Sequence, residues 1–311
     1  MLKKAIESKP VLIMMVITLA LLWGLSFIFT KDSMQYLKPI EVLSLRWLVA
    51  VIFFTILMVA KVVRIEYKNK PVKKLIPLVL CQPVIYSLLE TLGVNRATAS
   101  EAAVIIAALP FMVLLLGVII YKEHPEKKAI FGMFVGFSGV VVTIAFGPFF
   151  SLEGNLIGYF FLFAAITVGA CYSLQASKLS DEFSPFEITF AMTISGAVAY
   201  NLANAMMGNF LHTYSIYFQI PSLVLSSLFL GAGCSCLGFI ICNYILTRMN
   251  PPIATAVQCN AINLVGVIAG ILINGDPWGW YTIVGVALMT LGIIYVSLHT
   301  AKQSCQLDET V

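Results

Sequence analysis

The sequence predicts an all-α integral membrane protein with ten transmembrane helices, arranged as two five-helix repeats of inverted topology. Three observations predict this fold: the composition, ten long apolar stretches, and a similarity between the two halves of the chain. Of the 311 residues, 60% are hydrophobic and 11% are charged, whereas soluble domains average about 45–50% apolar and about 25% charged residues. Most of the chain is therefore expected to lie in lipid. This hydrophobicity excludes disorder, and the net charge of +4 does not favour nucleic-acid binding.

Ten apolar stretches are long enough to cross a bilayer, which takes about 20 residues of helix. They cover residues 11–30, 39–60, 75–94, 99–121, 129–147, 155–177, 186–207, 222–246, 252–274 and 279–299. The first stretch follows three lysines, as in a signal peptide. Its apolar run is too long for one and no A-x-A-like cleavage site follows, so we expect a retained helix. The alternating pattern of a membrane β-barrel is absent from the sequence.

The basic residues predict the orientation, because cytoplasmic loops carry an excess of lysine and arginine. With the N-terminus in the cytoplasm, 15 of the 19 basic residues fall on the inner side and three on the outer side, and Arg46 lies within the second stretch. Nine or eleven spans would destroy this bias. We therefore expect a multi-pass protein of the cytoplasmic membrane with both termini in the cytoplasm.

The two halves of the chain align with each other in the same order of residues. Near the end of each half the shift is 153 residues, and near the start it is 146–147. The aligned pairs are Glu123 with Asp276, Gly132 with Gly285, Gly139 with Gly292, Ser26 with Ser173, Lys31 with Lys178, and Lys38-Pro39-Ile40-Glu41 with Ser184-Pro185-Phe186-Glu187. Each match is weak on its own, and chance similarity between apolar helices is the alternative.

The repeat predicts the domain organisation and the class of function. A cytoplasmic N-terminus (1–10) precedes a first repeat (11–147), a second repeat (153–299) and a cytoplasmic tail (300–311). Because five is an odd number of spans, the second repeat enters the membrane from the opposite side. Such inverted repeats are typical of secondary transporters, whose central site opens alternately to each side.

Several motifs resemble one family, the EamA-type branch of the drug/metabolite transporter superfamily, over about residues 10–300. They are Trp23-Gly24-x-Ser26-Phe27, Leu45-Arg46-Trp47, and a fourth stretch that contains Pro110 and closes with Glu123. The second half departs from the pattern, since Asn263 replaces the proline and Asp276 the glutamate. The resemblance implies transport of amino acids, metabolites or drugs, often outward, without a prosthetic group.

Three ionisable residues inside the apolar stretches are the first candidates for a site. A charge within a span costs about 2.5–3.5 kcal/mol on insertion scales, so it should face the bundle interior and have a partner. Arg46, Glu90 and Glu101 lie at similar depth, and we expect Arg46 to pair with one of the glutamates. Arg46 would then bind a substrate carboxylate and a glutamate would titrate. The alternatives are a structural salt bridge and side chains that reach the headgroups.

Polar and aromatic side chains supply weaker candidates. Asn260 and Asn263 share one helical face near the middle of their stretch, which predicts a midplane site or only interhelical hydrogen bonds. The aromatic side chains either stack on substrate or pack; they are Trp23, Tyr86, Tyr172 and Tyr200. The remaining amides are equally ambiguous; they include Gln82, Asn243 and Gln258.

Other residues are interpreted structurally. Small residues four apart predict close helix contacts; they are the Gly132, Gly136 and Gly139 group and the Gly266 and Gly270 pair. Glu41 and Glu187 each follow a proline and suit the positive end of a helix dipole. The seven cysteines are expected to be small apolar fillers without disulfides or metal.

These features favour a secondary transporter of small organic solutes that works by alternating access, with proton exchange through Glu90 or Glu101 as one form of coupling. No phosphate-binding loop, metal-ligand cluster or Ser/His/Asp set occurs in the sequence, so we expect neither an enzyme nor a cofactor. The expected partners are the solute and the lipid bilayer, with the protein a monomer or homodimer. An uncoupled facilitator and a membrane sensor or enzyme remain alternatives, and the substrate is not identified.

Overall fold

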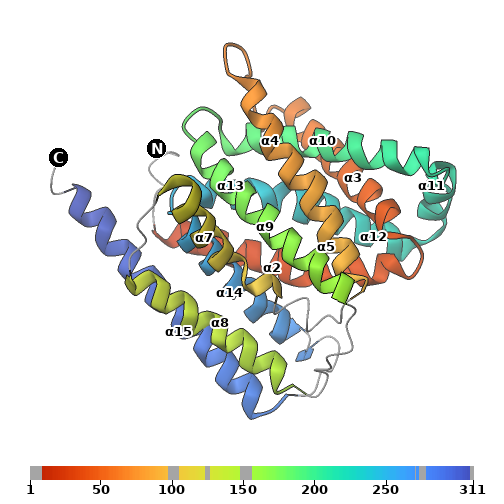
Figure 1. Cartoon of the computed structure of the whole chain (residues 1–311). Helices are drawn as coiled ribbons and strands as arrows, with labels where there is room; N and C mark the ends of the chain where they lie inside the picture. Colours follow the sequence, from red (N-terminus) through yellow and green to blue (C-terminus); the bar gives the residue numbers. More distant parts are fainter. Residues whose placement is uncertain are drawn as a thin grey trace.

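The computed structural model describes residues 9–96, 105–122, 127–147, 156–269, 271–272 and 278–308, and the regular elements in these ranges are all helical (Figure 1). In the N-terminal half the elements are α2 (Lys9–Met34), α3 (Pro39–Val59), η1 (Val72–Lys74), α4 (Leu75–Val79), η2 (Leu80–Ile85), α5 (Tyr86–Val94), α7 (Leu109–Tyr121) and α8 (Lys127–Ala145). In the C-terminal half they are α9 (Leu156–Leu179), α10 (Pro185–Met206), α11 (Phe210–Gln219), α12 (Pro221–Leu228), η3 (Phe229–Gly238), α13 (Phe239–Leu246), α14 (Pro251–Ala269) and α15 (Trp280–Asp308).

A helix occupies each of the ten apolar stretches, although the described part of the fourth stretch begins at residue 105. Six helical segments within the described residues are long and apolar enough to span a membrane, and shorter apolar helices accompany them. The chain is therefore a multi-pass membrane protein. The number of crossings and the inverted repeat stay predictions.

The structure also contains elements that the sequence did not predict. Residues 72–94 and 221–246 are each interrupted by a π-helical segment, η2 and η3. Helix α11 lies between α10 and α12, and α15 continues to Asp308, into the predicted tail. In a π-helix the backbone hydrogen bonds span five residues, so one turn is wider than in an α-helix.

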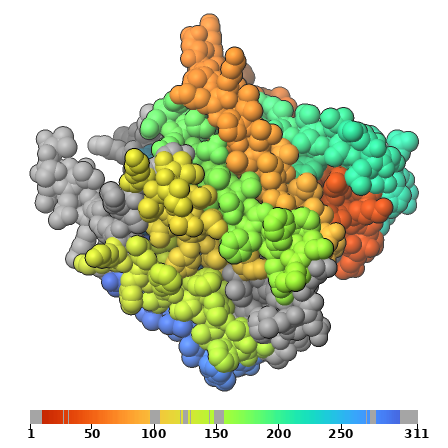
Figure 2. Space-filling view, viewed as in Figure 1, coloured from red at the N-terminus to blue at the C-terminus, as the bar shows by residue number. Residues whose placement is uncertain are grey.

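Helices α8 and α15 pack side by side through glycines, along one edge of the molecule (Figures 1 and 2). A Cβ added to Gly139 would lie 2.6 Å from the carbonyl oxygen of Gly285, and one added to Gly292 would lie 3.0 Å from that of Gly132. The close contact predicted for this group of glycines is confirmed. The prediction for Gly266 is wrong, because no atom of the described residues lies within 4 Å of an added Cβ there; its partner Gly270 lies outside the described residues.

Helices α3 and α10 also pack against each other, and a buried glutamate closes the first turn of each. Glu41 and Glu187 are 3% exposed, and each accepts the backbone N–H three residues before it, from Lys38 and Ser184 respectively. The predicted role of both glutamates at helix starts is confirmed. An acceptor at this position satisfies a backbone donor that the helix itself leaves unpaired.

Each glutamate is held from outside by the segment that follows the other helix. Glu41 Oε1 accepts from Thr213 Oγ1 at 3.0 Å and lies 3.3 Å from His212 Nδ1, both on α11 after α10. Glu187 accepts from the Glu66 backbone at 3.2 Å and from Lys70 Nζ at 2.6 Å, both after α3. We call these two sets of contacts the reciprocal caps.

Tyr67 completes the cap at Glu187 by donating from its hydroxyl to the Glu187 carbonyl at 2.6 Å. Burial raises the pKa of Tyr67 above its ordinary value, and the nearby Glu187 carboxylate raises it further. The hydroxyl is therefore protonated at neutral pH and available as a donor. The segment between α3 and η1 is thus fixed against the start of α10.

Candidate functional site

A cavity of about 150 Å³ lies between helices from both halves of the chain. Its wall is formed by α2, α3, η2, α5 and α7 from the N-terminal half and by α9, α13 and α14 from the C-terminal half. Tyr172 from the C-terminal half lines it, and so do four predicted site residues of the N-terminal half, namely Trp23, Arg46, Tyr86 and Glu90. The structure therefore brings together residues that lie up to 67 positions apart within this half of the sequence.

Arg46 reaches the cavity from α3 and is held in place by the other half of the chain. Its Nε donates to Ser235 Oγ at 2.6 Å. Ser235 lies in η3, whose Gly231 packs directly on α3, since an added Cβ would lie 2.7 Å from the Arg46 carbonyl oxygen. The hydrogen bond fixes one edge of the guanidinium, and the planar group has further N–H donors at its end.

Glu90 lines the same cavity from α5, one turn after Tyr86. The Tyr86 hydroxyl donates to Glu90 Oε1 at 3.0 Å. Spacing of four residues places both side chains on one face of the helix. A carboxylate can accept several hydrogen bonds, so this bond leaves Glu90 with capacity for another donor.

An ion pair between Arg46 and Glu90 is not among the ion pairs of the described residues, so the pairing of Arg46 with one of the two glutamates stays a prediction. Arg46 Nε instead donates to Ser235, and Glu90 accepts a hydrogen bond from Tyr86. Each charged group is thus oriented by a neutral partner. The alternative partner, Glu101, lies outside the described residues.

Aromatic rings form an apolar part of the cavity wall. Trp23 meets Phe239 edge-on with ring centroids 5.1 Å apart, and Tyr172 meets the same ring at 6.1 Å. Trp23 Nε1 donates to the carbonyl of Cys234 in η3 at 3.1 Å. Trp23 of α2 and Arg46 of α3 are therefore positioned by the same π-helical segment.

The other predicted residues lie elsewhere. Asn260 is buried against α8, where it contacts Gly136, and does not line the cavity. Asn263 is partly buried on α14 and is also not a lining residue. Tyr200 donates to the backbone of η2, at 2.6 Å from the Val84 carbonyl oxygen.

Sequence reasoning missed Ser235 and left Gln82 and Gln258 unassigned, although both glutamines line the cavity. A serine in an apolar stretch gives no signal, because most bond to their own helix. Within the described ranges, no three His, Cys, Asp or Glu side chains converge as metal ligands. The arrangement can hold an organic solute between a cation, a carboxylate and aromatic rings.

Comparison with known proteins identifies the family. The EamA-like transporter family matches residues 11–145 and 156–298 of the chain. The chain belongs to this family. Among curated proteins, the EamA-like chain is 25% identical to "Uncharacterized transporter YcxC" of Bacillus subtilis, over 90% of this chain and 91% of that protein. It is 27% identical to an "Uncharacterized transporter" of Archaeoglobus fulgidus, over 88% and 94% respectively.

The fold of this EamA-like protein is shared with solved structures. One of them, titled only "Crystal structure of protein", superposes with a TM-score of 0.74 at 16% identity, over 92% of this chain and 97% of the other. The resemblance to the EamA type is confirmed, and the protein is a membrane protein of a transporter family whose curated relatives are named as transporters. A transporter of this class binds its small-molecule substrate within the membrane.

Proposed function

We propose that this EamA-like protein is a secondary transporter that exports small organic solutes, such as amino acids or drugs, across the cytoplasmic membrane. The two predicted halves, 11–147 and 153–299, would gate the cavity alternately toward each side. The observation that carries the proposal is the pair of opposite charges, Arg46 and Glu90, on the wall of one cavity and without an ion pair between them. A solute that bears an acid group would find its partner at Arg46.

Two sets of contacts support the inverted repeat on which the proposal depends. When each residue is exchanged for its predicted equivalent, the Gly139–Gly285 contact becomes the Gly292–Gly132 contact. The same exchange turns the cap at Glu41 into the cap at Glu187, each made by the segment that follows the other helix. A pseudo-two-fold axis in the membrane plane would produce both pairings.

Replacement of Arg46 tests the proposed binding site. A thermal-shift screen of metabolites on purified protein first finds a stabilising acid, since a bound ligand stabilises in proportion to its occupancy. Loss of a charged hydrogen bond costs about 1.5–3 kcal/mol, so Arg46→Ala should weaken this binding about ten- to a hundredfold and abolish transport.

The matched control is Arg96→Ala, because Arg96 is exposed beyond α5 and lies outside the cavity wall. This variant should bind and transport as the parent does. Unchanged transport by an Arg46→Ala protein that inserts normally would contradict the proposal.

A further inference from the structure

Two buried glutamines on the cavity wall each have an amide atom without a hydrogen-bond partner. Gln82 is 3% exposed and Gln258 is 5% exposed. Gln82 Nε2 lies 3.4 Å from Ser87 Oγ, but its Oε1 is unpaired; Gln258 Oε1 lies 3.4 Å from Cys242 Sγ, but its Nε2 is unpaired. Within the described residues, only four buried side-chain polar atoms are unpaired, and these two are the ones whose residues line the cavity.

The neighbouring hydroxyls do not satisfy these amides. Ser26, Ser173 and Thr255 also line the cavity, and each donates to a carbonyl of its own helix, at 2.7, 3.1 and 2.7 Å. Their hydrogens are therefore committed within their own helices, and Gln82 Oε1 has no hydrogen-bond partner. An unpaired buried amide atom destabilises a protein by about the desolvation penalty of that atom. Both glutamines line the cavity, so a ligand that pairs with their free atoms would remove this penalty.

Gln82 differs from an ordinary helix residue in its backbone conformation. Gln82 has extended backbone angles, φ −133° and ψ 118°, inside the otherwise helical η2. Because of this break, the Gln82 side chain does not point in the direction that a regular helix would give it at this position. Gln258 belongs to α14, in the other half of the chain. A solute in the cavity would thus contact an amide from each half.

We propose that Gln82 and Gln258 form a subsite for an uncharged polar group of the solute, a carboxamide or a hydroxyl. The free oxygen of Gln82 requires a donor and the free N–H of Gln258 requires an acceptor. An ammonium offers only donors, a carboxylate only acceptors and an alkyl group neither. A carboxamide or a hydroxyl offers both. This subsite rests on the proposed function of the cavity and narrows its substrate class.

A stability measurement tests the subsite without any solute. Gln82→Met and Gln258→Met replace each amide with an apolar chain of similar length, so the thermal midpoint of purified protein should stay the same or rise. The control is Asn243→Leu, because this buried amide is fully used: Oδ1 accepts from Tyr172 at 2.8 Å and Nδ2 donates to Thr189 at 3.0 Å. Asn243→Leu should lower the midpoint. A fall of the same size in both glutamine variants would overturn the proposal.

A selectivity measurement tests the chemical class. The probes are L-asparagine, L-aspartate and L-leucine, which share one shape, together with L-threonine and L-valine. All five carry the same carboxylate and ammonium. Thermal shift should show the parent protein stabilised by asparagine or threonine at concentrations at least tenfold lower than by the matched alkyl or acidic probe, because a site that bonds a polar group rejects analogues without it.

The double variant Gln82→Met/Gln258→Met should lose this discrimination and still bind the alkyl probes. Retained discrimination, a parent preference for leucine, valine or aspartate, or no shift with any of the five would each overturn the subsite. Arg46→Ala separates the two proposals. It should weaken all binding solutes equally, whereas the glutamine variants should change only the ratio between probes.

Discussion

At the scale of single residues, the cavity wall combines a functional side chain with a neutral partner that holds it. Arg46 is held by Ser235, Trp23 by the Cys234 carbonyl, and Glu90 by Tyr86. A site whose side chains are fixed before the ligand arrives loses less conformational entropy on binding. The three interactions therefore support binding of a solute of defined shape.

Glu90→Gln tests proton coupling. Glutamine keeps the shape and the hydrogen bond to Tyr86 but cannot gain or lose a proton. Proteoliposomes that contain the parent protein should accumulate the solute identified by the Arg46 screen when a pH gradient is applied. We expect Glu90→Gln to equilibrate this solute without accumulating it. If the parent itself only equilibrates the solute, it is a facilitator, and if the variant accumulates it normally, Glu90 does not carry the proton.

The candidate residues could be predicted to different extents. Charge is so scarce in the apolar stretches that Arg46 and Glu90 were evident, and the structure places both on one cavity. Their partners were not evident, because a charge in sequence does not say which neutral group it meets. Ser235 lies 189 residues from Arg46, and only the packing of η3 on α3 brings them together.

At the scale of elements, the two helix starts illustrate what a local motif can predict. A proline followed two residues later by glutamate predicted how α3 and α10 begin, since both features act within one turn. The connecting segments that hold Glu41 and Glu187 were not predicted. They depend on α3 and α10 lying antiparallel and adjacent, which is a property of the packed bundle.

Glu187→Gln should lower the free energy of unfolding by about 2 kcal/mol, because it removes a charged acceptor from Lys70 and the buried helix start. Glu182→Gln is the matched control: the Lys74–Glu182 pair has side chains that are 56% and 33% exposed, against 31% and 4% for Lys70–Glu187. An exposed pair contributes about 0–1 kcal/mol. Denaturant unfolding in detergent measures both, and equal losses would show that burial at Glu187 adds nothing.

The π-helical segments and α11 could not be predicted from the sequence for a different reason. Hydropathy indicates whether a segment lies in lipid or in water, but it does not distinguish a π-turn from an α-turn of the same composition. The break at Gln82 and the wide turns of η3 change which side chains reach the cavity without changing composition. Such local geometry is set by tertiary packing, here the approach of α3 and Trp23 to the glycines of η3.

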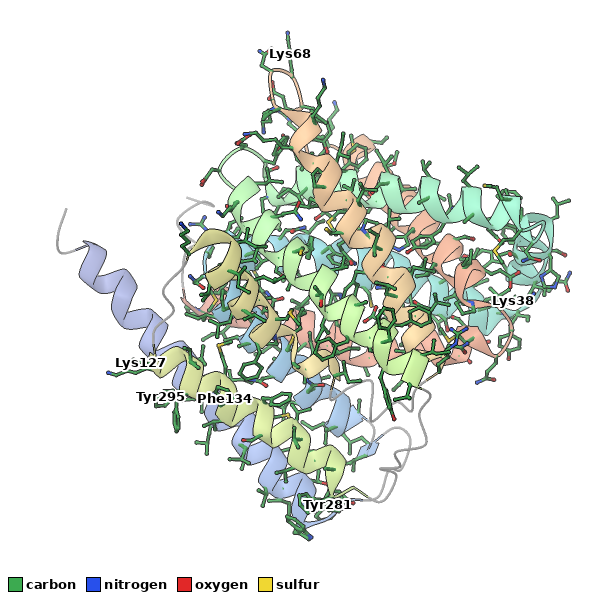
Figure 3. The ribbon with its side chains drawn as sticks, in the orientation of Figure 1. Lys38, Lys68, Lys127, Phe134, Tyr281 and Tyr295 are labelled. Atoms are coloured by element: carbon green, nitrogen blue, oxygen red, sulfur yellow. The ribbon has the colours of Figure 1, made fainter. Side chains whose placement is uncertain are left out.

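At the scale of the whole molecule, the predicted orientation assigns charged and aromatic residues to two sides of the membrane. Figure 3 places Lys68 and Tyr281 at opposite ends of the molecule, and Lys127 and Lys38 on opposite sides. In the predicted orientation Lys68 and Lys127 are inside, and Lys38 and Tyr281 are outside. The apolar composition predicted a helical membrane fold, because a segment in lipid must satisfy its backbone hydrogen bonds internally and a helix does this within one segment.

Cysteine labelling tests this orientation. On a parent whose seven cysteines are replaced, we expect Tyr36→Cys to react with an impermeant maleimide on intact cells. Lys68→Cys should react only after the membrane is opened. Both positions are exposed in the structure, so a lack of reaction would reflect the membrane. The reverse pattern would mean that the termini face outward.

The reciprocal caps have a consequence for how the protein is made. Residues 66 and 70 are already synthesised when Glu187 leaves the ribosome, so the cap of α10 can form at once. Glu41 must wait for His212 and Thr213, which follow about 170 residues later. Until then the Glu41 carboxylate, which is buried in the folded protein, lacks the hydrogen bond from Thr213 and the contact with His212. The start of α3 is therefore completed only late in translation. The two caps are equivalent in the folded protein, but the order of synthesis makes one of them form before the other.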